Sequence, residues 1–196
     1  VQKHAKSPAK TGLFGRGLYD EEGIDLESVK LIKEVKRGRI KEYLSCRPKA
    51  EYVEKGLIWS VPCDIALPCA TQNELDEEGA KHLIKNGCII VAEGSNMSTT
   101  LEAVKLLQKS GVYYCPGKAS NAGGVAVSAL EMSQNSCRLQ WTFEETDQKL
   151  RGIMRRIYES ISSTAEHYGA KDDLVMGANI AGFKKVAEAM IQQGVI

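Results

Sequence analysis

The sequence predicts an α/β fold, in which a partial parallel sheet has flanking helices and a C-terminal helical segment follows. Three short apolar runs are typical of buried strands, and a helical pattern of about ten residues separates each run from the next. Near-continuous apolar strands that alternate with helices indicate a parallel sheet covered on both faces. Beyond Gln140 only helical patterns remain, so we expect helices to complete the chain.

The predicted strands and helices alternate in the middle of the chain. The strands cover residues 64–68, 88–92 and 111–115, and the helices between them cover residues 75–86 and 99–109. A third helix begins near Asn121 and continues through Ser133, although Gly123 and Gly124 lie in its first turn. Glycine in a helix interior costs up to roughly 1 kcal/mol. We therefore expect a close approach there, either by another helix or backbone or by a ligand.

The C-terminal helices are predicted from a capping box and from apolar residues at helical spacing. Thr142 is followed three residues later by Glu145, which is typical of a helix start. The apolar residues of this helix are Leu150, Ile153, Met154, Ile157 and Ile161, and those of the last helix are Ile180, Phe183, Ala187, Met190 and Ile191.

The N-terminal part is less regular. Residues 1–17 are basic and aperiodic, and we expect a loop, a linker or a tail; their glycines do not form G-x-G-x-x-G and no strand precedes them, so we reject a phosphate loop. Residues 25–46 predict a helix, whose apolar side carries Val29, Ile32, Ile40, Tyr43 and Leu44. We expect one domain over residues 18–196, with residues 1–17 apart from it and no second domain.

Composition excludes several classes of function. The 196 residues are 43% hydrophobic and 26% charged, with a formal net charge of +1, as in an ordinary globular protein. The charge gives no bias toward nucleic acid or a membrane surface. Lysines and arginines in residues 25–46 could form an RNA-binding face, but the glutamates interleaved with them favour a solvated helix surface. We also see no membrane span and no signal peptide.

The six cysteines do not form a recognisable metal or disulfide pattern. None belongs to a C-x-x-C pair, and the three histidines do not cluster with them. Cys63, Cys69, Cys88 and Cys115 lie in or beside apolar runs, where cysteine behaves as a small hydrophobe. Buried or neutral thiols in a reducing compartment, the cytoplasm, are therefore favoured over a zinc site or disulfides.

Three polar segments follow the predicted strands directly, at residues 68–73, 93–97 and 116–124. Ligands of open parallel sheets bind outside the carboxyl ends of the strands, so we expect these segments to border one crevice. Ordinary turn and capping chemistry is the alternative for each segment taken singly. Val125 and Ser128 share a helix face close to the third segment. No nucleophile–base pair is recognisable, so we assign no catalytic residue and no metal ligand.

Four strings carry a resemblance to a known family: PCATQNELD at 68–76, EGSNMSTT at 93–100, PGKASNAGGVAVSALEMSQNS at 116–136 and GANIAGFKKVAEAM at 177–190. They resemble glutamate dehydrogenases of the hexameric, small-subunit, NADP type, and the similarity extends from about Tyr19 to Ile196. The resemblance implies a Rossmann-type cofactor-binding domain, with NADP or else NAD as cofactor, L-glutamate and 2-oxoglutarate as substrates, and a homo-oligomer as the assembly.

The resemblance also implies residue roles. Ala70, Thr71, Gln72 and Asn96 match cofactor-binding positions, and Asn121, Val125 and Ser128 match the substrate pocket, with the hydroxyl of Ser128 on the side-chain carboxylate of glutamate. The substrate domain with its catalytic lysines and aspartate, the first strand and the phosphate loop have no counterpart among these residues. We therefore expect the C-terminal part of the cofactor-binding domain, inactive by itself. The alternative is a non-catalytic module for subunit interaction, through an exposed sheet edge.

Overall fold

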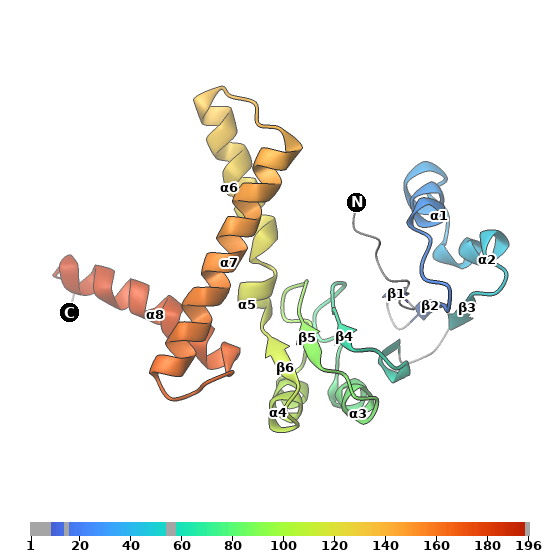
Figure 1. Ribbon diagram of the computed structural model, residues 1–196, viewed down its shortest axis with the longest axis horizontal. Coiled ribbons are helices and arrows are strands. Elements are labelled where there is room, and N and C mark those ends of the chain that lie inside the picture. The colour runs from blue at the N-terminus through green and yellow to red at the C-terminus, as the bar shows by residue number, and fades with distance from the viewer. Residues whose placement is uncertain (1–8, 14–15, 54–57, 195–196) are drawn as a thin grey trace. The chain divides into compact units, whose positions relative to one another are not determined.

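The computed structural model describes residues 9–13, 16–53 and 58–194 (Figure 1). Contacts divide the chain into two compact units, Val1–Val61 and Pro62–Ile196, called unit 1 and unit 2 below. The sequence pattern does not indicate a division at residue 61. The predicted boundary between residues 17 and 18 is a different one, and it stays a prediction.

Unit 1 contains an antiparallel sheet with the strand order β1-β2-β3. The strands are β1 (Ala9–Leu13), β2 (Arg16–Asp20) and β3 (Glu51–Val53). The predicted loop over residues 1–17 is therefore wrong at β1 and at the start of β2; residues 1–8 and 14–15 lie outside the described residues. Strands this short are held by main-chain hydrogen bonds, which almost any residue can form, so their composition carries little signal.

The predicted helix over residues 25–46 is interrupted in unit 1. The chain forms α1 (Leu26–Lys30), a π-helical segment (Leu31–Val35), a 3-10 turn (Ile40–Glu42) and α2 (Tyr43–Cys46), and a further 3-10 turn (Ile58–Ser60) follows β3. The interruption falls at Arg37, whose φ of 52° is left-handed and cannot continue a helix. The predicted apolar side is confirmed, because Ile32 and Tyr43 join Leu18 and Ala50 in the core of the unit.

Unit 2 is built on a parallel sheet with the strand order β4-β5-β6. Its strands, β4 (Ile65–Ala66), β5 (Ile90–Ala92) and β6 (Tyr113–Cys115), lie inside the three predicted ranges. The helices between them are α3 (Glu77–Lys85) and α4 (Leu101–Lys109), which pack against each other on one side of the sheet (Figure 1). The parallel α/β architecture predicted from the sequence is confirmed.

The two faces of this sheet are covered unequally. Ala66, Val91 and Tyr114 are buried. On β6, Tyr113 and Cys115 pack against a cluster made of Ala119, Ile161 and Leu174, whereas Ile65 and Leu67 at the β4 edge are 56% and 60% exposed. The prediction of a sheet covered on both faces is therefore wrong at β4, because α5, α7 and α8 contribute their apolar residues beside β6.

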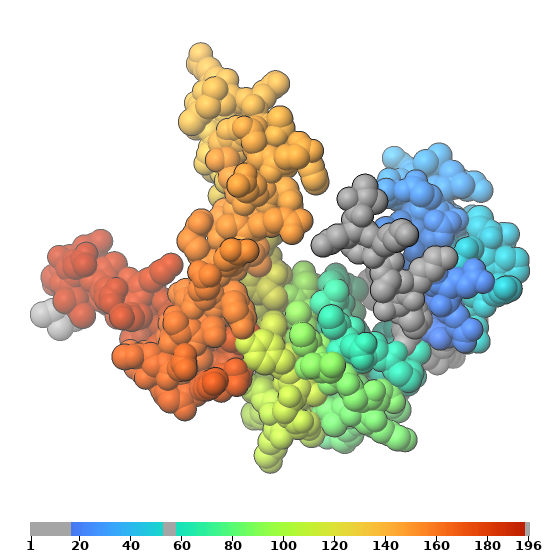
Figure 2. All heavy atoms as spheres, viewed as in Figure 1, coloured from blue at the N-terminus to red at the C-terminus, as the bar shows by residue number. Residues whose placement is uncertain are grey.

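Four helices follow the sheet: α5 (Gly117–Ser120), α6 (Ala122–Cys137), α7 (Phe143–His167) and α8 (Leu174–Gln192). The predicted capping box of Thr142 and Glu145 at the start of α7 is confirmed. Gly177 of α8 lies against the carbonyl oxygen of Ile161 so closely that a Cβ would overlap it, which fixes the crossing of α7 and α8. Figure 2 shows the outer half of α8 standing clear of α7. Among the described residues, no helix is both long and apolar enough to span a bilayer.

Candidate functional site

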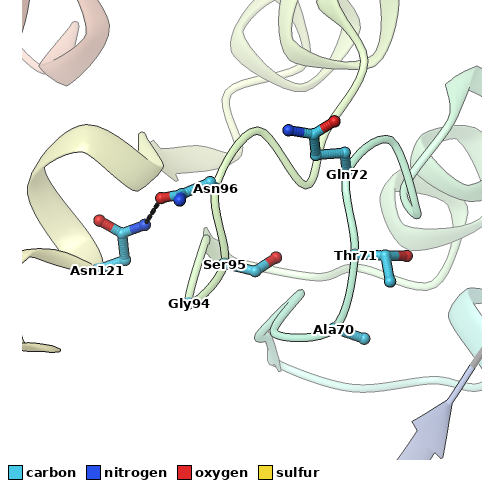
Figure 3. Close-up of a pocket in the computed structure, with 7 residues that line it drawn as sticks. All are labelled: Ala70, Thr71, Gln72, Gly94, Ser95, Asn96 and Asn121. Carbon is cyan, nitrogen blue, oxygen red and sulfur yellow. Dashed lines mark hydrogen bonds between the residues drawn. The ribbon is translucent and has the colours of Figure 1, made fainter.

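A pocket of about 440 Å³ lies at the carboxyl ends of β4 and β5. Its lining comes from three segments: Ala70, Thr71 and Gln72 after β4, Gly94, Ser95 and Asn96 after β5, and Asn121 at the start of α6 (Figure 3). The structure therefore brings together five of the seven residues predicted for the site. It also shows that the segments after the three strands border one hollow, as expected from the direction of the strands.

The segment after β4 is held in a fixed shape by its neighbours. The backbone N–H of Ala70 donates to the Glu74 carboxylate at 2.7 Å, and the N–H of Asn73 donates to the Met97 carbonyl at 2.9 Å. Asn73 has a left-handed φ of 55°, which asparagine tolerates better than most residues. These bonds fix the turn that presents Thr71 and Gln72 to the pocket.

The segment after β5 lies tightly against the segment after β4. The backbone N–H of Gly94 donates to the Pro68 carbonyl at 2.7 Å. A Cβ at Gly94 would overlap the Cys69 sulfur, so any larger residue here requires the Cys69 side chain or the loop to shift. Cys69 itself is a free, exposed thiol, whereas Cys88 is a free, buried one. Burial raises the pKa of the Cys88 thiol to about 11, with Cys63 adding to the shift.

Asn96 and Asn121 join the second and third segments through their side chains. The Nδ2 of Asn121 donates to the Oδ1 of Asn96 at 2.6 Å (Figure 3). This bond leaves the Asn96 amide group as a donor and the Asn121 carbonyl oxygen as an acceptor. Ser95 points from the same loop toward the segment of Thr71 (Figure 3). The residues that line the pocket thus offer neutral donors and acceptors, the kind that recognise an amide or a hydroxyl.

Glu93 is a functional candidate that the sequence reasoning missed. It directly precedes the pocket-lining Gly94 and is only 4% exposed. Its two carboxylate oxygens accept hydrogen bonds from the backbone N–H groups of Thr99 at 2.7 Å and Gly117 at 2.6 Å. Its own carbonyl accepts from the Ser120 hydroxyl at 2.6 Å. The available signal was a glutamate at the end of an apolar strand, where burial without partners is costly.

Val125 and Ser128 lie on α6 beyond the pocket and do not line it. Val125 is 71% exposed, and the exposed Ser128 hydroxyl donates to the Gly124 carbonyl at 3.3 Å. At Gly124 a Cβ would meet open space, and at Gly123 the nearest side chains are at an ordinary 3.7 Å, so no described part of the chain approaches the paired glycines closely and the approach of a ligand stays a prediction. The structure therefore places the predicted substrate residues next to the pocket along one helix, with no second wall opposite them among the described residues.

Titratable groups near the pocket do not form an acid–base set among the described residues. Tyr114 of β6 is buried, and burial raises the pKa of its hydroxyl well above the usual value. Burial likewise raises the pKa of the Cys115 thiol. No group of three or more histidine, cysteine, aspartate or glutamate side chains suited to a metal ion occurs in the described part of the chain. We therefore assign no proton-transfer pair to the pocket among the described residues.

A parallel sheet with a polar pocket outside its strand ends defines an α/β protein of the kind that binds ligands at that edge. Comparison with known proteins gives the family. The model of the Glutamate/Leucine/Phenylalanine/Valine dehydrogenase family matches residues 15–194. The chain therefore belongs to the glutamate, leucine, phenylalanine and valine dehydrogenase family.

Individual relatives agree with this assignment. An NADP-specific glutamate dehydrogenase of Helicobacter pylori is 52% identical over 185 residues, which cover 91% of this chain and 41% of the relative. An NAD(P)-specific glutamate dehydrogenase of Xylanibacter ruminicola is also 52% identical, with coverage of 91% and 40%. The crystal structure of Plasmodium falciparum glutamate dehydrogenase superimposes with a TM-score of 0.86 at 49% identity, covering 93% of this chain and 40% of that one. The chain thus spans about two fifths of the length of these relatives.

Proposed function

We propose that the pocket holds the nicotinamide end of NADP, or else NAD, in an enzyme that oxidatively deaminates L-glutamate to 2-oxoglutarate and ammonia. The observation that carries the proposal is the convergence of Thr71, Asn96 and Asn121 on one hollow in a chain of this dehydrogenase family. Relatives named as NADP-specific and NAD(P)-specific glutamate dehydrogenases support the cofactor and the substrate.

The lining fits a nicotinamide group in chemistry and in space. A carboxamide both donates and accepts, and Asn96 and Gln72 offer side-chain amides with the same two capacities. The missing Cβ at Gly94 brings backbone close to the hollow. When bound, the cofactor accepts the hydride that leaves the amino acid. Ala70, Thr71, Gln72 and Asn96 would hold it and orient its ring.

The substrate would lie along α6. Asn121, Val125 and Ser128 follow one another at helical spacing from the pocket outward. The Ser128 hydroxyl, which now donates to the Gly124 carbonyl within its own helix, can rotate and donate to the side-chain carboxylate of glutamate instead. Val125, which is exposed beside it, would contact the carbon chain.

Turnover requires proton transfer, and the described residues around the pocket offer no acid–base pair for it. We therefore propose that these 196 residues by themselves bind without turning over. Proton transfer by a positioned side chain contributes about a hundredfold or more, and orientation of the substrate from a second side adds to it. An assay of the purified chain with glutamate and NADP tests this, and turnover that co-purifies with the chain would contradict it.

Cofactor binding is tested by titrating the 15N-labelled chain with NADP and following its amide resonances. We expect the side-chain amides of Asn96 and Asn121 and the backbone amide of Gly94 to shift together. Asn96→Ala should weaken binding roughly tenfold, because one hydrogen bond and the bond to Asn121 are lost. Asn135→Ala, on the exposed part of α6, is the matched control and should bind as the wild type does. Shifts confined to other surfaces would refute the pocket as the site.

A second candidate function, a module that binds other subunits, is favoured by one observation. The outer half of α8 exposes Phe183 (73%), Val186 (59%) and Ile191 (76%). Such a patch on a helix is typical of a surface that another chain covers. We propose that the full protein is a homo-oligomer and, since all six cysteines are free thiols, that it resides in a reducing compartment, the cytoplasm. Light scattering that shows only monomer at high concentration would count against this module.

A further inference from the structure

Glu93 places a buried anion beneath the pocket. Both carboxylate oxygens accept from backbone N–H groups, those of Thr99 and Gly117, and such bonds stabilise the charged form of a carboxylate. Among the described residues no lysine, arginine or histidine forms an ion pair with it. Lys118, the nearest cation in sequence to Gly117, directs its ammonium group to the Asn179 side chain instead.

The position of this anion relative to the pocket follows from Gly117. A Cβ at Gly117 would lie 2.9 Å from the Glu93 Oε2 and 2.9 Å from the carbonyl oxygen of the pocket-lining Ser95. The carboxylate and the wall of the pocket are therefore within about 6 Å of each other. Backbone dipoles solvate the charge but do not cancel it, so its field extends into the hollow.

A nicotinamide ring changes its charge when it reacts: the oxidised ring is a cation and the reduced ring is neutral. A fixed anion at this distance stabilises the cation and leaves the neutral ring unaffected. We propose that Glu93 is an electrostatic specificity residue, which raises the affinity of the pocket for the oxidised cofactor relative to the reduced one. The inference rests on the proposed nicotinamide site. It goes beyond it by assigning the discrimination between redox states to a residue that does not touch the ligand.

The size of the effect can be anticipated from the charge alone. Two unit charges about 10 Å apart at an effective dielectric constant of about 20 to 40 change an equilibrium by roughly four- to sixteenfold. Glu93→Gln removes the charge and keeps the shape. We therefore expect this variant to weaken binding of the oxidised cofactor about tenfold more than binding of the reduced cofactor. Glutamine also loses one of the two oxygens that accept from the backbone N–H groups, but this loss weakens binding of both cofactor forms alike. The ratio of the two affinities therefore isolates the electrostatic contribution.

The test measures the dissociation constants of NADP and NADPH with the wild-type chain and with the variants Glu93→Gln and Glu93→Asp. Glu93→Asp keeps the charge, so its ratio should stay within twofold of the wild-type ratio even where both affinities fall. Glu93→Asp also tests the inference if Glu93→Gln does not fold. A tenfold change in the ratio of its NADP and NADPH dissociation constants would overturn the inference.

The outcomes separate the inference from the proposed function. If the wild type binds both forms and Glu93→Gln weakens both by the same factor, the pocket is confirmed and Glu93 is only a structural support. If the wild type binds neither form, the nicotinamide site fails and the inference fails with it. A ratio that changes in Glu93→Gln and is retained in Glu93→Asp supports the assignment.

Discussion

Among the described residues, each unit buries one carboxylate, and the two carboxylates have different partners. Asp20 in unit 1 is 2% exposed; it bonds the Arg47 guanidinium at 3.0 Å and accepts from the Tyr43 hydroxyl at 3.0 Å and from the N–H of Glu22 at 3.0 Å. Glu93 in unit 2 is 4% exposed; both of its oxygens accept from backbone N–H groups, and the Tyr114 hydroxyl is also in hydrogen-bond contact with it, but no described cation pairs with it.

This difference suits the two carboxylates to different roles: Asp20 stabilises the fold of unit 1, whereas Glu93 affects what the pocket binds. The charge of Asp20 is neutralised by Arg47, and Tyr43, which is fully buried, links the same carboxylate to the core. The charge of Glu93 is surrounded by dipoles beside a pocket, where a cationic ligand can complete its neutralisation. Removing Asp20 should therefore damage stability most, whereas removing Glu93 should also alter what the pocket binds.

The largest expected effect is on unit 1. Asp20→Ala leaves the buried Tyr43 hydroxyl without its acceptor and Arg47 without its buried partner. We expect the free energy of unfolding of unit 1 to fall by about 3 kcal/mol, as is usual when one member of a buried pair is removed. Urea unfolding followed by the fluorescence of Trp59, in a Trp141→Phe background, reports this unit. Glu22→Ala, which removes an exposed partner of Arg47, is the control and should cost less than about 1 kcal/mol.

The pH dependence of the wild type provides a check on the same network. Burial by itself raises the pKa of Asp20, but the hydrogen bonds from Arg47, from the N–H of Glu22 and from Tyr43 outweigh it and hold the pKa below its usual 3.8. The stabilisation is therefore fully present above pH about 4 and is lost as the pH falls through the lower, folded pKa. Asp20→Ala should lack this acid-dependent loss. An equal loss in both chains would contradict the role given to Asp20.

The sequence predicted unit 2 better than unit 1 for a physical reason. Its strands are apolar runs and its helices have capping residues, so local pattern and tertiary burial agree. In unit 1 the helix over residues 25–46 is interrupted at Arg37, and nothing in the apolar spacing shows that a left-handed residue stands there. The strand β1 could not be predicted from the sequence pattern either, because it forms through main-chain pairing with β2.

The part of the candidate site that follows from strand order could be predicted from the sequence. Turns that follow parallel strands share one edge of the sheet, so strand order alone predicts that Thr71, Asn96 and Asn121 lie together. The role of Glu93 was not predictable, because it depends on N–H groups of Thr99 and Gly117, which meet the carboxylate only in the folded chain. The exposure of Ser128 likewise depends on what lies opposite α6.

A smaller effect is expected where the pocket wall is packed most tightly. Gly94→Ala places a methyl group on the Cys69 sulfur, so the Cys69 side chain or the loop that carries Ser95 and Asn96 has to shift. We expect NADP binding to weaken about tenfold, equivalent to about 1.4 kcal/mol, with unit 1 unchanged. Tryptophan fluorescence and an NADP titration measure the two quantities on the same sample.

Two further variants show whether this loss comes from the clash. Cys69→Ala combined with Gly94→Ala removes the overlapping sulfur and should restore most of the affinity. Gly124→Ala, where a Cβ meets open space in α6, should bind normally and gain slightly in stability, because alanine favours a helix over glycine. If the double variant binds as poorly as Gly94→Ala, loop packing against Cys69 does not shape the pocket.

The smallest effect is expected from a solvent-exposed carboxylate that, like Glu93, accepts a hydrogen bond from a backbone N–H. Glu145 at the start of α7 accepts from the backbone N–H of Thr142 at 2.7 Å and is exposed. Glutamine can accept the same bond, and solvent already screens the charge, so Glu145→Gln should cost less than about 0.5 kcal/mol, measured by Trp141 fluorescence in a Trp59→Phe background. Thr142→Ala, which removes the cap itself, should cost about 1 kcal/mol. If Glu145→Gln lowered the free energy of unfolding as much as Glu93→Gln does, the backbone hydrogen bonds that both glutamates accept would explain both losses. Burial beside a pocket would then no longer distinguish Glu93.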